Sequence, residues 1–278
     1  IYYLTSFSGD QFSFSFIKEK KPDLLSGYYF PNYTAGLTFF IAVAATNLFH
    51  QGNWQRVYAA KNYEILKKSL IIAFIVIIPI VFFMGFCGLV AVSVDTNIIP
   101  DLGFFSLLLK EETKFLSLII IILGLSLTIS TVDTLVNAIS SLIVIDSKAT
   151  FNLKAKIDYL KLSKYFIVGI SIIAFFIASK GFSVLYLFLL ADLLCCAFVL
   201  TVFYSFYNKK LDEKTAYLSI IVGLIAGFLL FPMPDFSKSL LVGMILPVDV
   251  FPSFMSQSLL FLSFIVATFI PALIWKLR

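Results

Sequence analysis

Long apolar stretches, separated by short polar or basic segments, dominate the pattern of the chain. Most of these stretches approach or exceed the roughly 20 apolar residues that an α-helix needs to cross a bilayer. We expect seven membrane spans, at about residues 33–52, 69–94, 115–145, 165–179, 182–206, 215–232 and 254–275. The pattern therefore predicts an all-α, polytopic membrane protein.

The composition agrees with this class. Hydrophobic residues make up 60% and charged residues 13% of the 278 positions, whereas charged residues account for about 25% of an ordinary soluble domain. The net charge of +5 suits loops at an anionic membrane surface, and no basic cluster carries a motif that reads DNA. We expect a lipid bilayer and a small-molecule solute as partners, and no nucleic acid.

The distribution of basic residues predicts the orientation. If the loop after the first span is cytoplasmic, the inside segments hold 14 and the outside segments 7 of the 21 Lys and Arg residues. This asymmetry is what the positive-inside rule requires. The prediction is an integral protein of the plasma (inner) membrane with a cytoplasmic C-terminus.

One face of the span at 115–145 is polar. At helical spacing it gathers Ser126, Ser130, Asp133, Asn137 and Ser140 or Ser141. Because an unpartnered polar group is costly in hydrocarbon, this face must meet other helices, water or an ion. Hydroxyl side chains can simply hold membrane helices together, whereas an intramembrane carboxylate usually marks a functional site. Both interpretations stay open.

The first span turns polar in its second half. Asn47, His50 and Gln51 lie there, in the sequence NLFHQGNWQR. These side chains either line a cavity and bind a solute, or mark the helix end at the lipid headgroups. The crowding of side-chain amides around Gly52 favours a broken helix that lines a cavity.

Asp192 lies inside an apolar stretch and has no basic neighbour on its own helix. It either joins an ion or proton pathway or accepts hydrogen bonds from a Ser or Thr face. The sequence contains no GxSxG, P-loop or HExxH motif, and the single histidine has no obvious partner for a catalytic triad. We therefore expect a transport protein and not an enzyme.

Two segments carry a family resemblance. Residues 130–138 have the sequence STVDTLVNA, which fits the pattern Ser-[Ser/Thr]-x-x-[Ser/Thr]-x-x-Asn-[Ala/Ser], and an acidic residue, Asp146, ends the helix. Residues 47–62, NLFHQGNWQRVYAAKN, combine a broken helix with Gln-Arg-x-x-Ala-Ala-Lys. Together, over residues 33–210, they resemble the sodium/solute symporter family of sodium-coupled sugar, proline, pantothenate, iodide and urea carriers. The His-Gln-Gly version is most similar to the urea-transporter-like branch.

The resemblance implies an architecture of two inverted five-helix repeats. Residues 33–210 would form the second repeat, residues 211–278 two additional helices, and residues 1–32 an extracellular or interfacial loop segment. The first repeat would precede Ile1, so we expect missing N-terminal helices of the same polypeptide as a partner.

The resemblance also implies an ion site, with Na⁺ as the coupling ion. The sodium ligands of the family correspond to the hydroxyls of Ser130 and Thr131 and to the carbonyl of Leu127. Asp133 would assist ion entry. Hydroxyl and carbonyl oxygens suit a hard cation without burying another charge.

The sugar-binding Asn of the family corresponds to Asn47 and its aromatic gate residue to His50, a departure that disfavours sugar as the solute. The implied function is sodium-coupled symport of a small polar organic solute by alternating access, with urea or an amino-acid-like compound ahead of sugar. Two alternatives remain. One is a solute-sensing domain of the same fold linked to a signalling kinase, and the other is a proton-coupled carrier that uses Asp133 or Asp192.

Overall fold

The computed structural model describes residues 17–19, 21–94, 98, 102–108, 114–151, 158–207, 211–236, 238–242, 245 and 258–277. Residues 1–16, in the predicted loop segment, and 254–257, at the start of the last predicted span, lie outside the described residues. The described residues form helices and no strand, which confirms the all-α prediction.

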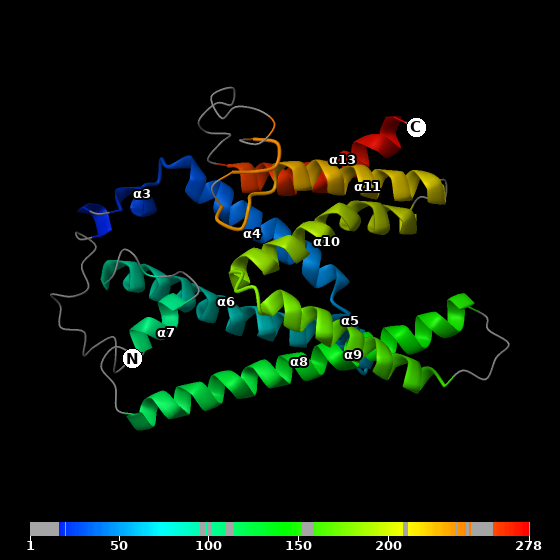
Figure 1. Cartoon of the computed structure of the whole chain (residues 1–278), viewed down its shortest axis with the longest axis horizontal. Coiled ribbons are helices and arrows are strands. Elements are labelled where there is room, and N and C mark those ends of the chain that lie inside the picture. Colours follow the sequence, from blue (N-terminus) through cyan, green and yellow to red (C-terminus); the bar gives the residue numbers. More distant parts are fainter. Residues whose placement is uncertain are drawn as a thin grey trace. The chain divides into compact units, whose positions relative to one another are not determined.

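Among the described residues, a long helix overlaps each of the seven predicted spans, and shorter helices lie mainly outside these spans (Figure 1). They are α3 (Pro22–Leu25), α4 (Phe30–Phe49), α5 (Gln51–Ala59), α6 (Tyr63–Val94), α7 (Gly103–Leu108), α8 (Lys114–Phe151), α9 (Tyr159–Ala178), α10 (Val184–Tyr207), α11 (Glu213–Leu230) and α13 (Leu259–Leu277).

Among the described residues, six helices are long and apolar enough to cross a membrane: α6, α8, α9, α10, α11 and α13. The chain is therefore a polytopic integral membrane protein. The helix at the first predicted span, α4, has 20 residues but is not one of the six. Its Asn and Thr side chains make it less apolar than the others.

The helices form two compact units, and we describe each by itself. The first unit contains α5 to α9, within Gln51–Gly181. The second contains α3, α4, α10, α11 and α13, within Lys18–His50 and Phe182–Arg278. The predicted division, with one repeat at residues 33–210 and two additional helices at 211–278, comes from the family resemblance. The two units do not test it, and it stays a prediction.

The second unit has its core around α10, which packs against α4, α11 and α13. The buried side chains of this core are Ala42, Ala45, Leu189, Leu193, Cys196, Ala197, Phe231, Phe264 and Ala267. Helices α11 and α13 run side by side (Figure 1). Glycines at 223 and 227 allow this close approach, because a Cβ there would lie 2.7 Å from Pro271 Cγ and 2.8 Å from Ala267 Cβ, respectively.

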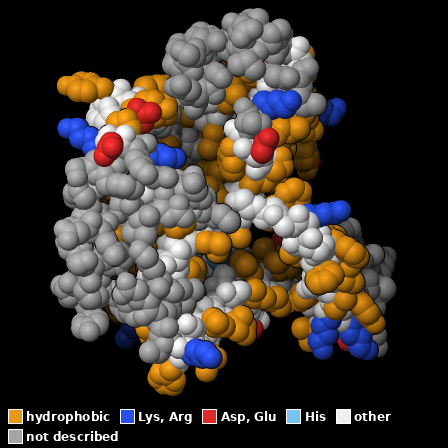
Figure 2. Space-filling view, turned by 60° about the vertical axis from the view of Figure 1, so that its left-hand side comes forward, with side chains coloured by type: hydrophobic (Ala, Val, Ile, Leu, Met, Phe, Trp, Pro, Cys, Tyr) orange, Lys and Arg blue, Asp and Glu red, His pale blue; other side chains and the backbone are white. Residues whose placement is uncertain are grey.

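In the first unit, α8 packs against α9 and α5, and α6 packs against α7. The apolar windows of α6 and α8 are only 6% and 0% buried within the chain. On the face shown in Figure 2, hydrophobic side chains gather over much of the described surface. Exposed apolar helix faces of this kind are suited to lipid or to further membrane helices.

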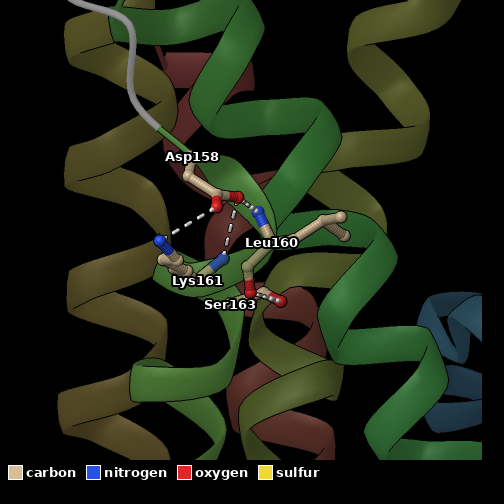
Figure 3. A network of polar contacts seen from close by, with 4 residues as sticks. All are labelled: Asp158, Leu160, Lys161 and Ser163. Atoms are coloured by element: carbon tan, nitrogen blue, oxygen red, sulfur yellow. Dashed lines mark hydrogen bonds and ion pairs between the residues drawn. The ribbon is translucent and has the colours of Figure 1, made fainter.

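Helix α9 begins before its apolar run. Asp158 caps it, because its Oδ1 accepts hydrogen bonds from the backbone N–H groups of Leu160 (3.1 Å) and Lys161 (3.2 Å) (Figure 3). Lys161 Nζ also lies 3.7 Å from the other carboxylate oxygen. The helix consequently starts at Tyr159, six residues before the span predicted from hydrophobicity at 165–179.

Candidate functional site

A break separates α4 from α5 in the polar half of the first predicted span. Helix α4 ends at Phe49, and His50 adopts an extended conformation with φ −73° and ψ 104° before α5 starts at Gln51. The His50 N–H turns back to the carbonyl of Asn47, 3.4 Å away. The broken helix expected from NLFHQGNWQR is thus confirmed.

The side chains at the break differ in how they are satisfied. Asn47 is exposed and its Nδ2 donates to the carbonyl of Val43 at 2.8 Å. Gln51 is half-buried at the start of α5. His50 Nδ1 is buried and has no hydrogen-bond partner in the part of the chain that the structure describes. A buried polar nitrogen without a partner is costly, so this atom is a candidate contact for a ligand.

Asp192 lies a third of the way along α10 and is only 5% exposed. Thr46, in the last turn of α4, donates its hydroxyl hydrogen to Asp192 Oδ1. Within the described residues, no Lys, Arg or His forms an ion pair with this carboxylate, and no hydrogen bond reaches Oδ2. The hydrogen bond from Thr46 is compatible with both interpretations of Asp192, as an acceptor for hydroxyl side chains and as part of an ion pathway. An ion role stays a prediction.

The sequence analysis did not identify Thr46 as the partner of Asp192. The two residues are 146 positions apart, and the chain contains many other Ser and Thr residues. Nothing in the local sequence singles out Thr46 among them.

Aromatic side chains surround the end of α4. The Phe49 ring lies 6.5 Å from the ring of Phe198 and 6.2 Å from that of Phe203, both in edge-to-face arrangements. Phe198 and Phe203 belong to α10, so the aromatic contacts continue the α4–α10 packing beyond the Thr46–Asp192 hydrogen bond. These contacts make Phe49 a packing residue between the two helices.

In the first unit, the predicted sodium ligands lie on the exposed surface of α8. Thr131 Oγ1 donates to the carbonyl of Leu127 at 3.0 Å, so two of the three predicted ligand oxygens are adjacent. Ser130 is on the same exposed part of the helix, and its own carbonyl accepts a hydrogen bond from Thr134 at 3.0 Å. Their coordination of Na⁺ stays a prediction.

Several hydroxyls of α8 form hydrogen bonds within their own helix. Ser126 and Thr128 donate to the carbonyls one turn earlier, at 2.8 and 2.9 Å, as Thr131 does. Such back-bonding removes the hydrogen-bond cost of a Ser or Thr in an apolar helix without any partner helix. These three hydroxyls therefore do not require a site, and Asp133 is the residue of this face that carries a formal charge.

Asp133 is exposed and accepts a hydrogen bond from Asn137 Nδ2 at 3.4 Å. Nearer the end of α8, Gln55 of α5 donates to Ser141 Oγ at 2.9 Å. The sequence analysis missed this contact, although Gln55 belongs to the Gln-Arg segment that follows the break. Across the described residues, no three His, Cys, Asp or Glu side chains gather as a metal site.

The chain is similar to a known membrane transporter. The chain is 28% identical over 194 residues to the spermidine transporter DUR31 of Candida albicans. The matched region covers 66% of this chain and 36% of the relative, so the chain spans about a third of that protein. No family model matches the chain. No solved structure matches it either.

Proposed function

We propose that this chain is part of a secondary active transporter that moves a small polar organic solute across a membrane with Na⁺ as the coupling ion. The observation that carries the proposal is the break at His50, in a chain whose other long helices are apolar enough to span a bilayer. Transporters bind their solutes at such breaks, because an interrupted helix offers backbone and side-chain polar groups. The similarity to a transporter supports this function over an enzymatic one.

The proposed ion site uses the oxygens of α8. The Leu127 carbonyl and Thr131 Oγ1, 3.0 Å apart, and the Ser130 hydroxyl supply oxygen ligands without a formal charge. The remaining ligands come from other helices of the complete protein. A site of this composition binds a monovalent ion reversibly, as a coupling ion requires.

Coupling follows from linked binding. Na⁺ and the solute each bind more tightly when the other is present, and this effect is reciprocal. One Na⁺ that crosses a potential of about 100 mV releases roughly 2.3 kcal/mol. Because about 1.4 kcal/mol corresponds to a factor of ten, this energy sustains roughly fiftyfold solute accumulation before any Na⁺ gradient is counted.

The solute site is proposed at the break. Asn47, His50 and Gln51 offer amide and imidazole donors and acceptors, which suit urea or an amino-acid-like compound. The name of the relative adds spermidine to the compounds to be tested.

The experiment uses the complete polypeptide in liposomes, with labelled urea, proline, glucose and spermidine and with Na⁺ or K⁺ outside. The variant Ser130→Ala/Thr131→Val removes both hydroxyls. Thr128→Val is the matched control, because Thr128 makes the same back-bond, to the carbonyl of Gly124 at 2.9 Å. We expect uptake of one solute to be Na⁺-stimulated, abolished in the double variant and retained in the control.

Other results have distinct meanings. Na⁺ stimulation that survives the double variant would contradict the proposed ion site. Uptake that follows a pH gradient and ignores Na⁺ would indicate proton coupling. Solute binding without uptake would favour the sensor alternative.

A further inference from the structure

We infer that the carboxylate of Asp192, held by Thr46, binds the ammonium group of a cationic organic solute. The inference rests on the proposed transport function and names the class of solute that this part of the protein recognises. It makes organic amines, and not neutral polar compounds, the preferred substrates.

The first argument is electrostatic. Asp192 is 5% exposed and has no basic partner among the described residues. A buried carboxylate is rarely left without a compensating charge, because its desolvation is costly. The described residues do not supply that charge, whereas the ammonium group of a bound solute would supply it.

The second argument is the position of the carboxylate. Thr46 is in the last turn of α4, which ends at Phe49. The C-terminal end of a helix carries a partial negative charge from its carbonyl groups. The hydrogen bond to Thr46 holds Asp192 beside this end, so a full and a partial negative charge add up at one place and favour a cation there.

The third argument selects an ammonium group over a bare ion. The buried residues of α10 on either side of Asp192 are apolar or weakly polar, namely Leu189, Leu193 and Cys196. A bare Na⁺ needs several oxygen ligands, as hard cations generally do. An alkylammonium ion has three N–H donors for the carboxylate and an apolar stem for these surroundings.

The acceptors still available fit the same ligand. One carboxylate oxygen, Oδ1, accepts from Thr46, while Oδ2 has no hydrogen bond within the described residues. His50 Nδ1 is a second acceptor candidate, buried and without a partner in the same part of the chain. Thr46 and His50 are four residues apart, about one helical turn. A solute with one ammonium group and a further N–H donor can use both acceptors.

The test measures equilibrium binding of labelled spermidine to the complete, detergent-purified protein, next to uptake of spermidine and urea in liposomes. Asp192→Asn keeps the shape and the acceptor for Thr46 but removes the charge. We expect it to weaken spermidine binding about tenfold to a hundredfold, as for loss of a hydrogen bond to a charged group. Asp146→Asn is the matched control, because Asp146 is an exposed aspartate on α8. The affinity of this variant for spermidine should equal that of the wild-type protein.

Two results would overturn the inference: unchanged spermidine binding by Asp192→Asn, or a wild-type protein that transports urea with Na⁺ and binds no spermidine. The second result leaves the proposed transport function intact. Spermidine binding that depends on Asp192, without Na⁺-stimulated uptake of any solute, would have the opposite meaning. It would support the amine site and contradict the transport proposal.

A second measurement applies if Asp192→Asn does not fold. Dicyclohexylcarbodiimide is an apolar reagent that modifies carboxyl groups in membrane-embedded positions, and peptide mass spectrometry locates the adduct. In the wild-type protein, spermidine should protect Asp192 from modification, whereas 1-butanol, which lacks the charge, should not. Equal modification with and without spermidine would contradict the inference.

Discussion

Replacing Gly223 by Ala tests whether close packing of α11 on α13 holds the second unit together. A Cβ at this position would lie 2.7 Å from Pro271 Cγ and 3.0 Å from both Pro271 Cδ and the backbone carbonyl oxygen of Ala267. A ring and a backbone atom yield less readily than the tip of a flexible side chain. The two helices must therefore move apart to admit the methyl group.

The expected magnitude combines two opposite effects. Overpacking in a tight interface costs about 1–3 kcal/mol, whereas Gly to Ala inside a helix stabilises by up to about 1 kcal/mol. Gly36→Ala is the matched control, because Gly36 lies within α4 of the same unit with nothing within 4 Å of the added Cβ. The difference between the two variants isolates the packing cost, which we expect to be about 1–3 kcal/mol.

The assay follows the buried thiol of Cys196, which is 0% exposed in the core that α13 covers. A thiol-reactive dye reports the temperature at which this core opens, and mass spectrometry assigns the modified peptide. Gly223→Ala should lower the opening temperature, and Gly36→Ala should leave it equal or slightly raised. A Gly223→Ala protein as stable as Gly36→Ala would refute the packing argument.

Two further predictions concern the described hydrogen bonds. Asp158→Ala removes the cap of α9, so amide hydrogen exchange at Leu160 should accelerate, consistent with a loss of about 1 kcal/mol; unchanged exchange would contradict the capping role. Trp275→Phe keeps an aromatic ring stacked on Tyr204, 4.5 Å away, but loses the 3.3 Å hydrogen bond from Nε1 to Ser219. We expect a loss of about 0.5–1.5 kcal/mol in unfolding free energy, and a stability equal to the wild type would show that this bond contributes nothing.

The sequence predicted the long helices because an apolar run that crosses a bilayer must satisfy its backbone hydrogen bonds internally, and a helix does so. It also predicted the break at His50, where amides and a glycine interrupt such a run. Helix ends were less predictable where polar residues extend the helix: α9 starts at Tyr159 because Asp158 caps it, not because the residues are apolar. Hydrophobicity alone could not give that position.

The contacts between distant segments lay beyond sequence reasoning. The role of Asp192 depends on Thr46 from α4, and only the folded packing of α4 against α10 pairs them. On α8, the polar spacing suggested a site, yet Ser126, Thr128 and Thr131 all bond to their own helix. The spacing of hydroxyl residues alone is therefore weak evidence for a functional site. A carboxylate inside a membrane helix is stronger evidence.

The most direct test of the central claim is the accumulation ratio of the transported solute in liposomes that contain the complete protein. The liposomes carry an inward Na⁺ gradient and an inside-negative potential, and the ratio is measured before and after a sodium ionophore is added. The account predicts accumulation well above the outside concentration, up to roughly fiftyfold from about 100 mV alone for one Na⁺, and collapse with the ionophore. A ratio that stays at one, whatever the Na⁺ gradient, would contradict it.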